Sequence, residues 1–209
     1  MIQVVENIIA EYCSKYKLLD WILENKIDWD FLSINPNAIH LLEKNPNKIY
    51  WISLSINPNA IHLLEKNPDK IFWNWLSGNP NAIHLLEKNP DKLFWNWLSK
   101  NPNAVHLLEA NQHKIDWFYL SKNPNAMHLL EKNLDKIDWI LLSGNPNAIH
   151  LLEENLDTQN PQGFNINWYE LSENPNAIYM LEKNPDKIFW GYLSENSSIF
   201  KLIKPILNL

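Results

Sequence analysis

The sequence predicts an all-α protein, an α-solenoid of about eight 22-residue, two-helix repeats with a capping segment at each end. Three observations predict this fold. The motif Asn-Pro-Asn-Ala recurs every 22 residues, a tryptophan lies six residues before each copy, and each unit carries two helix start signals. A fixed period of this length is typical of stacked supersecondary units rather than of an ordinary globular domain.

The prolines and tryptophans set the repeat boundaries. The motif prolines are Pro36, Pro58, Pro80, Pro102, Pro124, Pro146 and Pro175, and the last interval is 29 residues because seven residues are inserted at 158–164. The tryptophans are Trp29, Trp51, Trp73, Trp95, Trp117, Trp139, Trp168 and Trp190. We therefore expect a single repeat domain over 1–209, with an N-terminal cap at 1–24, tandem repeats at 25–195 and a C-terminal cap at 196–209.

The first helix of a unit starts at the Asn-Pro-Asn-Ala motif and is called here the Asn-Pro helix. In the first copy Asn35 suits the N-cap, because its side chain can accept a hydrogen bond from a helix N–H group. Pro36 suits the first helical position, where no N–H is needed. Residues 38–44 continue the helix, Asn45 suits a left-handed position after it, and Pro46 ends it. The apolar side consists of Ala38, Ile39, Leu41 and Leu42.

The second helix carries the tryptophan and is called here the tryptophan helix. In the sixth copy, Asp135 is the expected N-cap, and Asp138 three residues later resembles a capping box. Leu134 is then placed to pack on Trp139 in the first turn, and the helix ends at Asn145. Both helices have roughly two turns and are marginal alone, so stacking against neighbouring repeats must stabilise them.

A leucine-rich repeat has a similar period and is the alternative fold. Residues 137–145 even place Ile, Leu and Asn at matching positions. A strand would require alternating side chains, whereas the repeated Trp139 and Leu142 lie three residues apart, as on a helix. The helical solenoid is therefore favoured over a leucine-rich-like binding module.

The consensus unit is I-x-W-x-x-L-S-x-N-P-N-A-I-H-L-L-E-K-N-P-D-K. It resembles the Asn-Pro-Asn-Ala/Trp tandem repeats that occur in many copies in giant DNA virus genomes, over about Asn25 to Asn196. The absence of Arg and the abundance of Asn agree with an AT-rich viral genome. The resemblance implies repeat-mediated interaction inside an infected host cell, in the host cytoplasm, and no catalytic residues. The insertion after Asp157 departs from the pattern, so we expect stacking to be less uniform there.

Composition narrows the function further. The net charge is −6 and no Arg is present, which disfavours nucleic-acid binding because that rests on clustered basic residues. The single cysteine, Cys13, cannot form an internal disulfide and fits a reducing, intracellular compartment. The N-terminus has no basic region before its apolar residues, so no signal peptide is expected. No apolar run reaches ~18 residues, so no membrane-spanning helix is expected.

Six histidines occupy one position of the repeat and a glutamate follows each by three residues. One His and one carboxylate are too few ligands for a structural zinc site, and adjacent repeats ~10 Å apart are too distant to share an ion. We expect a solvated ridge, with a pH-responsive ridge as the alternative, because aligned imidazoles could become charged together near pH ~6–6.5. The histidines are His40, His62, His84, His106, His128 and His150.

Most strictly repeated residues are interpreted as structural. The eight tryptophans share a helical arc with leucine and are the predicted core. The repeated serines are expected to bond a carbonyl of their own helix, because eight equal copies do not provide the singular setting of a nucleophile. No catalytic residue, metal site or cofactor is therefore predicted, and the protein is not expected to be an enzyme.

Two variable positions of the repeat carry many aromatic residues: the one before each tryptophan and the one two residues after it. They predict a binding stripe, because exposed aromatic side chains anchor many interfaces. The alternative is that these rings pack between neighbouring repeats. The predicted stripe consists of Phe31, Tyr50, Phe72, Trp75, Phe94, Trp97, Tyr119 and Tyr192.

The sequence therefore predicts a non-enzymatic repeat scaffold for protein–protein interaction, with an unidentified protein partner and without nucleic acid or membrane. The alternative is a self-assembling structural component, which the hydrophobic C-terminal sequence SIFKLIKPILNL favours.

Overall fold

The structure, a computed structural model, describes residues 19–20, 22–157 and 166–199, and falls into two compact units, Met1–Ala104 and Val105–Leu209. The described part of both units consists of α-helices and 3-10 helices and contains no strand. The predicted all-α repeat architecture is confirmed, with a regular alternation of helices and packing between neighbouring repeats. The leucine-rich alternative is wrong, because it requires a strand in each repeat.

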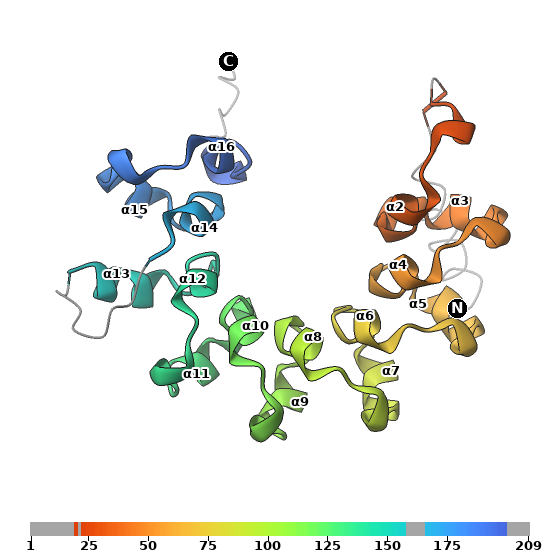
Figure 1. The fold of residues 1–209 in the computed structure, drawn as a ribbon, viewed down its shortest axis with the longest axis horizontal. Coiled ribbons are helices and arrows are strands. Elements are labelled where there is room, and N and C mark those ends of the chain that lie inside the picture. Colours follow the sequence, from red (N-terminus) through yellow and green to blue (C-terminus); the bar gives the residue numbers. More distant parts are fainter. Residues whose placement is uncertain (1–18, 21, 158–165, 200–209) are drawn as a thin grey trace, which may run out of the picture. The chain divides into compact units, whose positions relative to one another are not determined.

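Unit 1 contains two rows of short helices (Figure 1). The tryptophan helices form one row, in which each contacts the next: α2 (Trp29–Ile34), α4 (Trp51–Ile56), α6 (Trp73–Ser77) and α8 (Trp95–Lys100). The Asn-Pro helices form the other: α3 (Ile39–Lys44), α5 (Ile61–Lys66) and α7 (Ile83–Lys88). The 3-10 helices of this unit are η1 (Glu24–Lys26), η2 (Pro36–Ala38), η3 (Pro46–Lys48), η4 (Pro68–Lys70) and η5 (Pro90–Lys92).

Unit 2 has the same two kinds of helix. Its tryptophan helices are α10 (Trp117–Ser121), α12 (Trp139–Leu142), α14 (Trp168–Glu173) and α16 (Trp190–Leu193). Its Asn-Pro helices are α9 (Val105–Glu109), α11 (Met127–Leu130), α13 (Ile149–Asp157) and α15 (Ile178–Lys183). Its 3-10 helices are η6 (Gln112–Lys114), η7 (Pro124–Ala126), η8 (Leu134–Lys136), η9 (Pro185–Lys187) and η10 (Ser197–Ile199).

Leucine and alanine, rather than tryptophan, form the fully buried core. In the second repeat Leu54, Ala60 and Leu64 are each 0% exposed, and their counterparts in the repeats between the first and the last are at most 2% exposed. The predicted tryptophan core holds for Trp139, which is 7% exposed, whereas Trp190 is 66% exposed and the other tryptophans are half-buried. For the half-buried rings the physical reason is that one face is covered by a lysine of the next repeat rather than by apolar side chains, as at Trp29 and Trp51.

The tryptophan helix starts later than predicted. Asp135 lies in the separate 3-10 helix η8, which has no side-chain cap, and the N-cap of α12 is Asp138, whose side chain accepts from the backbone N–H of Leu141. Trp139 is therefore the first helical residue, so the predicted capping box is wrong, and Leu134 and Trp139 do not occupy the helix positions on which their predicted contact was based. Residues 134–138 contain two successive turn signals, and the second one starts the helix.

The Asn-Pro helix is close to the prediction. Asn35 caps a first turn that is 3-10 rather than α, and its side chain accepts from the backbone N–H of Asn37. Asn45 was predicted to be left-handed, but its φ is −128°, so this prediction is wrong. Its side-chain amide donates to the carbonyl oxygen of Leu41, 3.0 Å away. This bond satisfies a C-terminal carbonyl group of the helix that has no intrahelical partner.

The predicted terminal caps lie largely outside the described residues, because 1–18 and 200–209 are not described. The insertion predicted at 158–164 lies within 158–165, which is also outside them.

Candidate interaction surface

Within each unit, a hydrogen-bond ladder of buried asparagines joins one repeat to the preceding one. The side-chain amide of Asn57 donates to the carbonyl oxygens of Ser33 and Asn35, at 2.9 and 3.0 Å. Its side-chain oxygen accepts from the backbone N–H of Asn59, so one side chain both caps its own helix and binds the neighbouring repeat. The same pair of bonds is made by Asn79, Asn101, Asn145, Asn174 and Asn196.

Two further repeated residues complete this ladder. The second asparagine of the motif, as at Asn59, donates to the carbonyl oxygen of Pro36 in the preceding repeat at 2.9 Å. Ser33 donates to the carbonyl oxygen of Trp29 at 2.7 Å, which confirms the predicted structural role of the serines. The same hydroxyl group accepts from the backbone N–H of Tyr50 in the next repeat, at 3.1 Å. Repetition of Asn-Pro-Asn and Ser therefore follows from stacking.

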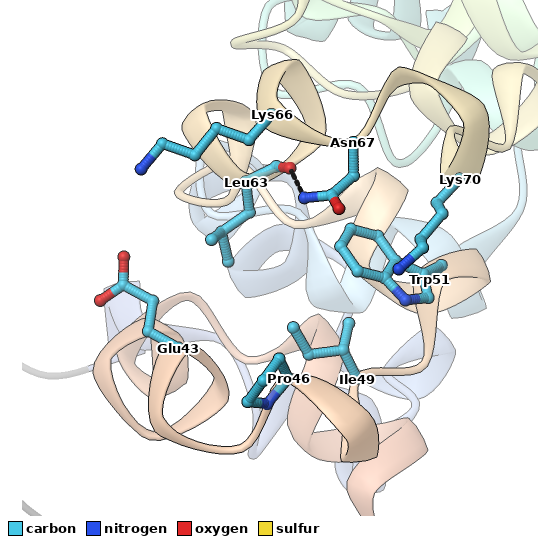
Figure 2. A pocket seen from close by; sticks show the side chains of 8 residues that line it. All are labelled: Glu43, Pro46, Ile49, Trp51, Leu63, Lys66, Asn67 and Lys70. Atoms are coloured by element: carbon cyan, nitrogen blue, oxygen red, sulfur yellow. Dashed lines mark hydrogen bonds between the residues drawn. The ribbon is translucent and has the colours of Figure 1, made fainter.

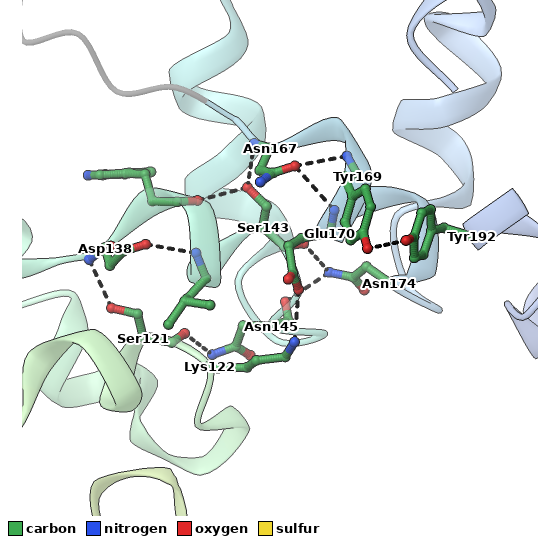
Figure 3. A network of polar contacts seen from close by, with 12 residues as sticks. Ser121, Lys122, Asp138, Ser143, Asn145, Asn167, Tyr169, Glu170, Asn174 and Tyr192 are labelled. Atoms are coloured by element: carbon green, nitrogen blue, oxygen red, sulfur yellow. Dashed lines mark hydrogen bonds and ion pairs between the residues drawn. The ribbon is translucent and has the colours of Figure 1, made fainter. Parts of the chain in front are cut away.

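The ladder continues across the insertion in unit 2 (Figure 3). Asn174 donates to the carbonyl oxygens of Ser143 and Asn145, both at 3.0 Å, although the insertion separates the two repeats. The backbone N–H of Asn167 donates to the hydroxyl group of Ser143 at 2.9 Å. These bonds match those between uninterrupted repeats, so the expectation of disturbed stacking at this point is wrong for the described residues.

An ion pair in the same region connects two repeats that are separated by a third one. The ammonium group of Lys122 lies 2.8 Å from the Glu170 carboxylate, whose side chain is only 18% exposed (Figure 3). Between them lies Gly144, where an added Cβ would meet the Glu170 carboxylate oxygen at 2.6 Å. The absence of a side chain at Gly144 therefore lets the pair form.

A lysine of the next repeat covers the face of several tryptophans. In unit 1 the ammonium groups of Lys48, Lys70 and Lys92 lie 4.4, 4.6 and 4.5 Å from the ring centroids of Trp29, Trp51 and Trp73. In unit 2 Lys136 and Lys187 cover Trp117 and Trp168 in the same way. These cation–π contacts stabilise partly exposed rings, which is why a half-buried tryptophan is retained at this position.

Four of the six histidines pair with glutamates of the preceding repeat, not of their own helix. The Nε2 atoms of His62 and His84 lie 2.8 and 2.9 Å from the carboxylates of Glu43 and Glu65. The pairs His128–Glu109 and His150–Glu131 are equivalent, at 2.7 and 3.0 Å. Side chains of adjacent repeats therefore do meet here, and the distance argument against a shared site is wrong. Among the described residues no group of three or more His, Cys, Asp or Glu could hold a metal ion.

The predicted aromatic stripe divides into two groups with different environments. The rings two positions after the tryptophan are mostly half-buried and pack on each other: the centroids of Trp75 and Trp97 are 4.8 Å apart. Trp97 also lies against Gly78, where an added Cβ would be 3.0 Å from the ring. Tyr119 and Tyr192 are half-buried too, whereas Phe31 is 75% exposed. At Trp75 and Trp97 the alternative of packing between repeats is therefore correct.

The rings directly before the tryptophan are exposed instead. Tyr50, Phe72 and Phe94 occupy this position in three successive repeats of unit 1 and are 45%, 41% and 48% exposed. Their backbone N–H groups donate to the serine hydroxyl groups of the preceding repeat, at 3.0 to 3.1 Å. The backbone is thus fixed independently of the side chain, which leaves the side chain able to vary. These three rings are called here the exposed ring set.

This position is also the N-cap of the tryptophan helix, and other repeats use it as such. Asp28, Asp116, Asp138 and Asn167 each accept a hydrogen bond from a backbone N–H in the first helical turn. The exposed ring set makes no such bond in α4, α6 and α8, and Phe189 makes none in α16. Sequence reasoning missed this exchange because it placed the helix start three residues too early.

A cavity of about 300 Å³ lies between two repeats of unit 1 (Figure 2). Its walls are apolar at Pro46, Ile49, Trp51 and Leu63, with Glu43, Lys66, Asn67 and Lys70 around them. Three of these polar groups have partners within the protein: Glu43 binds His62, Asn67 binds the carbonyl oxygen of Leu63, and Lys70 covers Trp51. Little polar capacity is left to orient a small ligand.

Comparison with protein-family models, with curated proteins and with solved structures gives no match to the chain. The described helices include none with the length and apolar character needed to cross a membrane.

Proposed function

We propose that the protein is a non-enzymatic repeat scaffold and that the exposed ring set of unit 1 contacts a protein partner. The observation that carries this proposal is the replacement of a helix cap by an exposed ring in three successive repeats. Tyr50, Phe72 and Phe94 stand where Asp28 and Asp116 cap their helices.

The replacement weakens the fold. Loss of an N-cap costs about 1 kcal/mol, and a ring that is 41–48% exposed does not gain the full benefit of burial. Three repeats in a row share this feature, so the exposed rings lie at one position of successive helices α4, α6 and α8. Aromatic side chains are the commonest anchors of protein interfaces. A partner that buries the rings would offset the loss of the three caps.

The charge of the chain supports a protein partner over nucleic acid. The net charge is −6 and the chain has no Arg, whereas nucleic-acid binding depends on basic clusters that face phosphates. The repeat motif supports the further proposals that the chain belongs with giant-virus tandem repeats and that it functions inside a host cell.

The test is a charge substitution that the fold already tolerates. The double variant Phe72→Asp/Phe94→Asp introduces aspartate, which other repeats already have at this position, as at Asp116 and Asp138. The matched control Phe118→Asp/Phe189→Asp makes the same charge change at two exposed rings of unit 2, 51% and 50% exposed. Affinity capture from source cells, read by mass spectrometry, identifies proteins that depend on the first pair, and thermal melts verify that both variants are folded.

A captured protein is then purified and titrated by calorimetry. We expect the unit 1 variant to bind at least about 30-fold more weakly, since an interface anchor contributes about 2 kcal/mol or more, and the unit 2 variant to bind like the wild type. Equal binding by both variants, or the absence of any specific partner for the wild type, would contradict the proposal.

A further inference from the structure

The first repeat that the structure describes has an unused set of ladder donors. Asn35 is exposed, whereas its counterparts from Asn57 onward are almost fully buried. Its side-chain oxygen caps Asn37, but within the described ranges its side-chain amide nitrogen has no acceptor. Asn37 and the backbone N–H of Asp28 equally lack the partners that Asn59 and the backbone N–H of Tyr50 have one repeat later.

The last described repeat has the matching unused acceptors. In earlier repeats the carbonyl oxygens of the serine and of the first motif asparagine accept from the next asparagine side chain. Over 166–199, the carbonyl oxygens of Ser194 and Asn196 receive no such donor, and the Ser194 hydroxyl group is exposed. Trp190 is 66% exposed and, in this part of the chain, no lysine covers its ring.

The two sets are complementary because both belong to one repeat interface. Each residue of the second repeat that contacts the first repeat has an equivalent 22 residues earlier, on the first repeat. These equivalents are the residues that can contact the last repeat of another copy. Lys26 then takes the place of Lys48, which covers Trp29. Asn35 takes the place of Asn57, and the backbone N–H of Asp28 takes that of Tyr50.

We propose that a second copy of the chain stacks head to tail on this end, with its first repeat placed on the last repeat of its neighbour. In this register the Asn35 side chain of one copy donates to the carbonyl oxygens of Ser194 and Asn196 of the other. The backbone N–H of Asp28 donates to the Ser194 hydroxyl group, and Lys26 covers Trp190. Contact of two different surfaces is heterologous, so it generates a ring or an open chain rather than a closed symmetric dimer.

Apolar side chains at the same two ends support this register. Phe31 is 75% exposed and stands at the repeat position at which Trp75 and Trp97 pack on each other. In the proposed junction it faces the equivalent Tyr192, which already packs on Tyr169 with ring centroids 3.6 Å apart. The junction thus buries apolar rings together with the ladder, as the internal junctions do.

The test measures the mass of the full chain in solution by sedimentation, from low micromolar to submillimolar concentration. We expect the average mass of the wild type to rise steadily with concentration. Asn35→Asp keeps the oxygen that caps Asn37 but replaces the ladder donor by a charged acceptor that faces two carbonyl oxygens. It should weaken association at least about tenfold. The matched control Asn47→Asp, at an exposed position where other repeats already have Asp69 or Asp91, should associate like the wild type.

A mixing experiment establishes the head-to-tail arrangement. Trp190→Ala removes the acceptor-end ring, so this variant should also associate at least about tenfold more weakly alone. Mixed with Asn35→Asp, each variant supplies the end that the other lacks, and the mixture should form one-to-one dimers and nothing larger. A wild type that stays monomeric over this concentration range would overturn the proposal. Unchanged association of Asn35→Asp, or a mixture without dimers, would overturn it as well.

Discussion

The side-chain amide of Asn79 donates to the carbonyl oxygen of Ser55 at 3.0 Å, and both residues are fully buried. The same nitrogen donates to the carbonyl oxygen of Asn57 at 2.9 Å. Since both acceptors belong to the preceding repeat, one side chain holds two repeats together where water cannot replace it. A buried acceptor left without a partner is costly, so this asparagine is more tightly constrained than a helix cap alone requires.

The first prediction tests this double role. Asn79→Ala removes two buried hydrogen bonds and the cap on Asn81, and should lower the free energy of unfolding by about 2–4 kcal/mol. Asn81→Ala is the matched control, because its side chain makes one exposed bond, to Pro58. It should cost less than about 1 kcal/mol. Chemical denaturation of both variants gives the comparison, and equal losses would contradict the ladder as the dominant contact.

The period and the helical class could be predicted from the sequence because they depend on local signals. Proline and asparagine mark each Asn-Pro helix, and the spacing of Ala38, Ile39 and Leu42 identifies a buried side, all three being at most 8% exposed. The start of the tryptophan helix was less accessible, because Asp135 and Asp138 are both good N-caps. Only the structure shows that Asp138 is used.

Contacts between repeats could not be derived in the same way. The pairing of His62 with Glu43, nineteen residues earlier, depends on how two repeats stack. The sequence also places Glu65 three residues after His62 on the same helix. No local signal shows whether His62 pairs with Glu65 or with Glu43. The asparagine ladder did leave a signal: a residue needed only as a cap can be exchanged for Asp, Ser or Thr, yet Asn never varies at Asn57 and its counterparts.

The second prediction concerns the tryptophans. Trp139 is 7% exposed, so Trp139→Ala should lower the free energy of unfolding by about 3–5 kcal/mol. Trp190 is 66% exposed, so Trp190→Ala should change it by no more than about 0.5 kcal/mol. Both are measured by denaturant titration at concentrations below those at which the chain associates. A large loss at Trp190 under these conditions would restore the interpretation of all eight tryptophans as core.

The third prediction uses the contact between Tyr169 and Tyr192. The Tyr169 hydroxyl group donates to that of Tyr192, and this bond raises the pKa of Tyr169 from 10.0 to about 12, with smaller contributions from burial and neighbouring charges. A raised pKa means that the protonated form is favoured in the folded state. The stabilisation is therefore complete below pH 10.0 and is lost as the pH rises through about 12.

An absorbance titration of tyrosinate formation measures this shift. Tyr192→Phe removes the acceptor, so the late-titrating tyrosine should disappear and Tyr169 should ionise closer to 10.0. Tyr179→Phe, which removes another exposed tyrosine of unit 2, should leave the late transition in place. A late transition that persists in Tyr192→Phe would show that the pair does not cause it.

The last prediction returns to the position at which the exposed ring set replaces a helix cap. Phe72→Asp should raise the free energy of unfolding by up to about 1 kcal/mol, because the carboxylate can accept from backbone N–H groups at the start of α6. Asp116→Phe makes the reverse exchange in α10, where Asp116 accepts from Tyr119, and should lower it by a similar amount. Thermal and chemical unfolding of the two variants measure the pair of changes. If Phe72→Asp instead destabilises the protein, the ring contributes to packing. Its presence is then explained by stability, and it no longer supports a contact with a partner.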